Sequence, residues 1–65
     1  MKTLRLSFTS HGVEVVTVKL YKVTKRSLNY WQVYMSRFGV SELLGEFENR
    51  CEALEFFHGT IDLYI

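Results

Sequence analysis

Residues 19–34, KLYKVTKRSLNYWQVY, contain two segments suited to β-strands with a short link between them. The first segment ends at Val23 and the second begins at Tyr30, and both are rich in the β-branched and aromatic residues that favour extended backbone. The link between them, TKRSLN at residues 24–29, is mostly polar. The stretch therefore predicts a hairpin. Its basic and aromatic side chains raise a question of function: it either holds nucleic acid or is the ordinary middle of a small sheet.

Alternation extends the sheet on both sides of this hairpin. A turn at Ser10–Gly12 connects an alternating first strand at Thr3–Thr9 to a long β-branched strand at Val13–Val23, and a third strand covers Tyr30–Phe38. Period two assigns to one core face the residues Val16, Val18, Leu20, Trp31, Val33 and Met35. In the first strand it sets Leu4, Leu6 and Phe8 on one side and Thr3, Arg5, Ser7 and Thr9 on the other.

The last third of the chain predicts one helix. Residues 40–47 fit either a short edge strand or a helical turn. Asn49 with Glu52 three residues later is typical of a helix start, and Gly59 is typical of a helix end. The alternation of Thr60–Ile65 then predicts a final strand. The apolar arc expected on the helix contains Cys51, Ala53, Leu54 and Phe57.

These elements make one small α+β domain over residues 1–65. The order β-β-β-(β)-α-β predicts an antiparallel sheet of three to four strands, one helix packed on one face, and a C-terminal strand. A chain of 65 residues buries only about 60% of the surface that its unfolded form exposes. Its core is therefore thin, and a partner subunit would stabilise it.

The composition limits the classes of protein. With 48% hydrophobic and 15% aromatic residues, the chain is too apolar for a disordered tail. Its single cysteine, Cys51, excludes an intrachain disulfide and favours a reducing compartment. No apolar run reaches the roughly 20 residues of a membrane span, and the start MKTLRLSF lacks the apolar core of a signal peptide. We therefore expect a soluble cytoplasmic protein with no membrane partner.

Charge is divided along the chain. Residues 1–37 hold seven lysine or arginine side chains and one carboxylate, whereas residues 38–65 hold one arginine and six carboxylates. Such a division orients a partner on one side of the molecule. Alternatively, the two halves neutralise each other within the fold or across a dimer.

Residues suited to catalysis or metal binding are few. Cys51 and His58 are seven residues apart and share a helical face, while His11 lies in a turn. Two ligands fall short of the four that a structural zinc needs, and no CxxC or HxxxH spacing or glycine-rich phosphate loop occurs. Cys51 is expected to face the core, where a thiol is inert. We expect no enzyme activity, metal, cofactor or small-molecule substrate.

Residues 30–57 carry a resemblance through the segments YWQVYMSRFG and LGEFENRCEALEFF. They resemble the strand–strand–helix unit of the three-stranded DNA-binding domains in AP2 factors and at the N-terminus of phage-type integrases. In that family, basic side chains on the sheet enter the major groove. Here the corresponding strand at residues 43–47 is acidic, so the resemblance implies the fold alone. The build is also similar to that of small phage-encoded inhibitor proteins.

A protein-binding role follows from the helix. Phe56 lies about 160° from Leu54 on a helical wheel, so one sheet face cannot bury both side chains. Framed by Glu52 and Glu55, Phe56 predicts an anchor for a protein partner. In the alternative, Phe56 belongs to a local cluster, covered by Val40, Leu43 or Leu44. The predicted function is a small non-enzymatic inhibitor or adaptor, and the thin core and long edge strand also favour a homodimer.

The alternative function is nucleic-acid binding on the sheet face that the helix leaves open. Bases stack on aromatic rings and cations neutralise phosphates, so a basic and aromatic open face suits a single strand. The residues predicted for this role are Lys19, Tyr21, Lys25, Arg26, Tyr30 and Tyr34. Alternation adds Arg5 and Gln32 to the same face, and Lys22 lies near the hairpin end.

Overall fold

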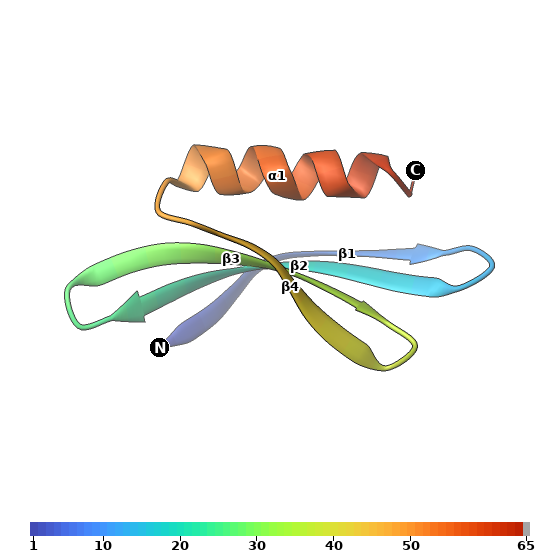
Figure 1. The fold of residues 1–65 in the computed structure, drawn as a ribbon, viewed down its shortest axis with the longest axis horizontal. Coiled ribbons are helices and arrows are strands. Elements are labelled where there is room, and N and C mark those ends of the chain that lie inside the picture. Colours follow the sequence, from blue (N-terminus) through green and yellow to red (C-terminus); the bar gives the residue numbers. More distant parts are fainter. Residues whose placement is uncertain (65) are drawn as a thin grey trace.

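The protein is a four-stranded antiparallel sheet with one helix on one face, and the computed structural model describes residues 1–64. The strands follow one another in space in the order β1-β2-β3-β4, and the helix lies along one side of them (Figure 1). The elements are β1 (Lys2–His11), β2 (Val15–Lys25), β3 (Leu28–Arg37), β4 (Val40–Phe47) and α1 (Arg50–Asp62). The predicted α+β class and the single helix are confirmed.

The central hairpin is tighter than the sequence suggested. Lys25 pairs with Leu28, so only Arg26 and Ser27 connect β2 to β3, and most of the expected link belongs to the strands. Thr24 opposes Asn29, and the Thr24 hydroxyl donates to the Asn29 side chain at 3.0 Å. Polar residues at these positions therefore pair across the hairpin instead of forming a loop.

The core lies between the helix and the middle strands. Val16, Val18 and Leu20 of β2 and Val33 of β3 are all at most 2% exposed, as the alternation predicted. From the helix, the core receives Ala53, Phe57 and Ile61. Trp31 and Met35 are partly buried at its margin. Since α1 packs against β2, β3 and β4, the opposite face of the sheet is left open (Figure 1).

The expected alternation of the first strand is wrong at its beginning. Leu4 pairs with Tyr21, whereas Leu6 pairs with Leu20, and a register shift separates the two pairs. One extra residue at Arg5 moves every earlier side chain to the other face, which is what a β-bulge does. Leu4 therefore lies on the open face with Tyr21, and Leu6 and Phe8 lie on the helix side.

Residues 40–47 form a strand, which decides between the two structures that the sequence allowed. β4 pairs with β3 throughout, and a second register shift leaves Leu44 as an extra residue between Leu43 and Gly45. The residue after the shift, Gly45, has no Cβ atom, and a Cβ atom there would lie 3.0 Å from the ring of Phe47. The aromatic ring of Phe47 thus occupies the space that any other residue at position 45 would fill.

The helix begins where the sequence predicted. The Asn49 side chain accepts hydrogen bonds from the backbone N–H groups of Cys51 at 2.7 Å and Glu52 at 3.4 Å, which makes it the N-cap. The predicted burial of Cys51 is wrong, because its side chain is exposed. The buried side of the helix begins at Ala53 instead.

The predicted final strand is also wrong. The helix continues through Gly59 to Asp62, and Leu63 and Tyr64 form a turn, while Ile65 lies outside the described residues. Ile61 follows Phe57 by four residues, so it fits the helical period as well as the alternation and is buried against the sheet. The Thr60 hydroxyl donates to the Phe56 carbonyl at 2.8 Å within the same helix.

Candidate functional site

Positive and negative charges are separated between parts of the fold. The carboxylates of the second half lie on β4, on α1 and between them, whereas the seven cations of the first half lie on the first three strands and their turns and Arg50 begins α1. Within residues 1–64 a single ion pair is found, between Arg37 and Glu14 at 3.5 Å, and it joins two residues of the first half. The two halves therefore do not neutralise each other through close ion pairs in the monomer.

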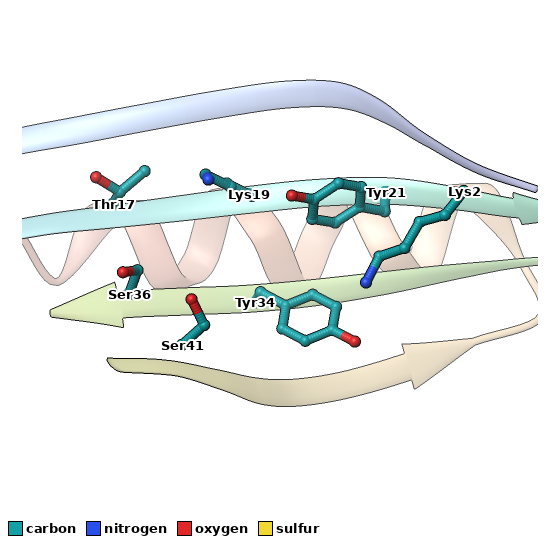
Figure 2. Close-up of a pocket in the computed structure, with 7 residues that line it drawn as sticks. All are labelled: Lys2, Thr17, Lys19, Tyr21, Tyr34, Ser36 and Ser41. Carbon is teal, nitrogen blue, oxygen red and sulfur yellow. The ribbon is translucent and has the colours of Figure 1, made fainter. Parts of the chain in front are cut away.

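The open face carries the basic and aromatic side chains that the sequence placed there. Figure 2 shows this face with the helix behind the sheet. Cross-strand pairing of Lys19 with Tyr34, Tyr21 with Gln32, and Val23 with Tyr30 puts all these side chains on one side. Lys25 and Arg26 lie apart from them, exposed at the β2–β3 turn.

Lys2 is a member of this surface that the sequence did not indicate. Its Nζ atom lies 4.5 Å from the ring centre of Tyr21 and 4.1 Å from that of Tyr34, and the two rings meet edge to face at 5.6 Å. The β-bulge brings Lys2 here, because it moves the start of β1 to the open face. The bulge itself falls at Arg5, which was expected on this face and pairs with no residue of β2.

A small hollow of about 150 Å³ lies beside these residues, and hydroxyl groups complete its lining. The set drawn in Figure 2 is Lys2, Thr17, Lys19, Tyr21, Tyr34, Ser36 and Ser41. Neither lysine forms an ion pair in the described chain. We call this set the open-face site; its ammonium and hydroxyl groups are suited to an anion such as a phosphate.

Neighbouring side chains already satisfy much of the open face. The Tyr34 hydroxyl donates to Gln32 Oε1 at 3.3 Å, and Gln32 Nε2 donates to Glu46 Oε2 at 2.9 Å. Glu46 also brings a negative charge to this face. Lys22 points to the other side, where its Nζ atom lies 5.9 Å from the Trp31 ring centre. The positive charge of the open face is therefore modest.

A second surface lies on the helix side of β4, where α1 leaves apolar side chains uncovered. One hollow of about 370 Å³ between α1 and the sheet is lined by Met35, Leu44, Phe56, Gly59, Thr60, Leu63 and Tyr64. A smaller one of about 200 Å³ continues from Met35 toward the β3–β4 turn and is lined by Met35, Arg37, Phe38, Val40 and Glu42. Because they share Met35, we treat them as one surface, the β4 groove.

Phe56 is at the helix side of this groove. It remains 37% exposed, and its ring contacts Phe47 with a centroid distance of 5.2 Å. Of the residues considered as a cover for Phe56, Leu44 lines the same hollow, Val40 lines only the neighbouring one, and Leu43 lies on the other side of the sheet. Glu52 precedes Phe56 by one helical turn and shares its side of the helix, whereas Glu55 lies about 100° away and faces solvent.

Phe38 is the residue of this surface that sequence reasoning missed. It is 80% exposed, and both it and Gly39 have positive φ angles, of 54° and 75°, as in a type I′ turn. Such a turn favours Asn-Gly or Asp-Gly, because a bulky side chain is strained in the left-handed region. A Phe-Gly pair between two strands was therefore the signal available in the sequence.

Comparison with protein-family models, with curated proteins and with solved structures finds no match to this chain. Within residues 1–64, no helix is both long and apolar enough to cross a membrane. In the same residues, histidine, cysteine and carboxylate side chains do not gather in threes as metal ligands would. The geometry of the two surfaces is thus the basis for a functional proposal.

Proposed function

We propose that the protein is a small, non-enzymatic protein-binding module, an inhibitor or adaptor, that holds its partner in the β4 groove. The observation that carries the proposal is the half-exposed Phe56 ring beside an apolar hollow of about 370 Å³. Leu63, at 78% exposure, borders the same hollow. Aromatic residues beside an apolar recess are the usual energetic centres of protein interfaces.

Charge indicates the chemistry of the partner. The elements that form the groove carry Glu42, Glu46, Glu52, Glu55 and Asp62, with Glu48 between them, against Arg50 of α1 and Arg37 of β3, which pairs with Glu14. Apart from Glu14, none of these carboxylates is within ion-pair distance of a cation in the described chain. A partner segment with apolar side chains and several lysine or arginine residues would match both the groove and its charge.

The test is a selection of displayed random peptides against the intact, immobilised protein. We expect the selected peptides to combine large apolar residues with lysine or arginine. Titration of one such peptide should show an affinity at least about 30-fold lower for Phe56→Lys, the loss typical of a central interface residue. Selection of acidic peptides, or equal affinity for the variant, would contradict the proposal.

Two further variants control for damage to the fold. Leu63→Lys adds a charge at the groove margin. Because the Leu63 side chain is 78% exposed, the lysine can extend into solvent without disturbing the fold. Leu4→Lys adds the same charge to a residue that is 49% exposed on the open face, in β1 at the other edge of the sheet. Peptide binding should fall for Leu63→Lys and stay within about twofold of the unmodified protein for Leu4→Lys.

A second candidate function is nucleic-acid binding at the open-face site. The observation in its favour is the position of Lys2, whose ammonium group joins Lys19 beside the rings of Tyr21 and Tyr34. Titration with single- and double-stranded oligonucleotides at low salt tests it. Binding that weakens steeply with salt and is lost in a Lys2→Ala, Lys19→Ala double variant supports this function. No binding at tens of micromolar excludes it.

A further inference from the structure

We infer that the partner binds as an extended strand that pairs with the outer edge of β4, an inference that rests on the proposed protein-binding function. β4 is the last strand in the sheet order, and no strand of the described chain pairs with its outer side. Backbone N–H and C=O groups along this edge therefore have no strand partner in the described chain, and the edge belongs to the strand that supplies Leu44, Val40 and Glu42 to the groove. A peptide strand added to such an edge gains backbone hydrogen bonds and places alternate side chains in the pockets beside it.

The two sides of β4 give the added strand its side-chain preferences. Pairing with β3 puts Val40 and Glu42 on the groove side, and Leu44 also lines the groove. On the other side lie Leu43, which is exposed, and Glu46. A bound strand would therefore set apolar residues against Leu44 and Phe56 at alternate positions, with cationic residues near the carboxylates on both sides.

Charge favours this occupant over a second copy of the chain. Lysine, proline and β-bulges commonly protect edge strands from pairing; β4 has neither lysine nor proline, and its bulge at Leu44 leaves residues 40–43 regularly paired with β3. Its edge carries Glu42 and Glu46, with Glu48 just beyond. Pairing β4 with its own copy would bring these carboxylates close together, which is repulsive. A basic strand removes that repulsion.

The experiment uses a peptide selected on the intact protein, with single backbone N-methyl groups introduced at successive positions. In an extended strand only every second N–H faces β4, so each methyl group that blocks a hydrogen bond has a matched control at the next residue. We expect the affinity to fall at least about tenfold at alternate positions and to change less than about threefold at the positions between them.

The outcomes separate this inference from the proposed function. If the peptide still requires Phe56 but its affinity does not fall at alternate N-methylated positions, the protein-binding function stands and the strand geometry is overturned. A peptide indifferent to Phe56→Lys and to Leu63→Lys overturns both. Sedimentation provides a third outcome: a dimer that tightens when Glu42 and Glu46 are both changed to Gln would place a second copy at this edge and overturn the inference.

Discussion

The open face and the β4 groove lie on opposite sides of one sheet and differ in how their side chains are satisfied. On the open face, polar groups bond to one another: Tyr34 donates to Gln32, and Gln32 donates to Glu46. In the β4 groove, Phe56 and Leu63 expose apolar surface that no other part of the described chain covers.

This difference decides which surface depends on a partner. A polar sheet face is stable in water, and its residues suit a half-exposed strand for that reason alone. Exposed apolar side chains beside a hollow gain free energy only when something covers them. Substitutions on the two surfaces are therefore expected to have different effects on stability and on binding.

The largest effect is expected from the core that separates the two surfaces. Leu20→Ala should lower the free energy of unfolding by about 2–5 kcal/mol, because Leu20 is 2% exposed and its loss leaves a cavity. Leu63→Ala should change it by less than about 0.5 kcal/mol. Urea unfolding of both variants measures the contrast. Equal losses would make Leu63 part of the core and remove the case for an open groove.

Charge reversal on the helix compares two glutamates, one on the side of α1 that carries Phe56 and one on the side that faces solvent. Glu52→Lys should weaken binding of a selected basic peptide about fivefold, because Glu52 shares the helical side of Phe56. Glu55→Lys should change it less than about twofold, since Glu55 faces solvent on the far side of the helix. Isothermal titration at moderate salt measures both. A larger effect at Glu55 would place the partner on the outer side of α1.

Phe38→Asn should stabilise the protein while it weakens peptide binding. Asparagine tolerates the φ angle of 54° better than phenylalanine, so the free energy of unfolding should rise by about 1 kcal/mol. For a domain of this size the Tm would rise by roughly 4–8 °C. The affinity should fall, because the ring borders the groove.

Phe38→Ala is the control for this pair of effects. It removes the ring but leaves a side chain in the left-handed region, so we expect weaker binding without the gain in stability. A Phe38→Asn variant that is less stable than the unmodified protein would show that the ring contributes to the fold.

The smallest effect is expected at Lys2. Replacement by alanine removes its contacts with the Tyr21 and Tyr34 rings and should cost about 0.5–1 kcal/mol of unfolding free energy. Affinity for a groove-binding peptide should not change, since Lys2 lies on the opposite face. Thermal unfolding and one peptide titration check both statements. A loss of peptide affinity would assign the partner to the open face.

Much of the fold was predictable from local patterns. Val16, Val18 and Leu20 alternate with polar residues over a long β-branched run, and this pattern indicates a half-buried strand. Asn49 at the helix start was equally clear. Ile61 was ambiguous, because its position satisfies both the alternation of a strand and the period of a helix that continues through Gly59.

The two surfaces were less predictable, because single inserted residues shape them. Alternation does not reveal a bulge, so neither the arrival of Lys2 beside Tyr21 nor the extra residue at Leu44 could be placed. The position of Phe56 on the helical wheel was enough to predict that it lies outside the core. Phe38 required recognising that Phe-Gly replaces the usual Asn-Gly of a tight turn.

A map of the partner's contact surface would show directly whether the partner binds in the β4 groove. Backbone and side-chain chemical shifts of isotope-labelled protein would be followed by NMR during titration with a selected basic, apolar peptide. The β4 groove predicts the largest changes at Val40, Leu44, Phe56 and Leu63, with little change on the open face. Changes confined to Lys19, Tyr21 and Tyr34 would contradict it.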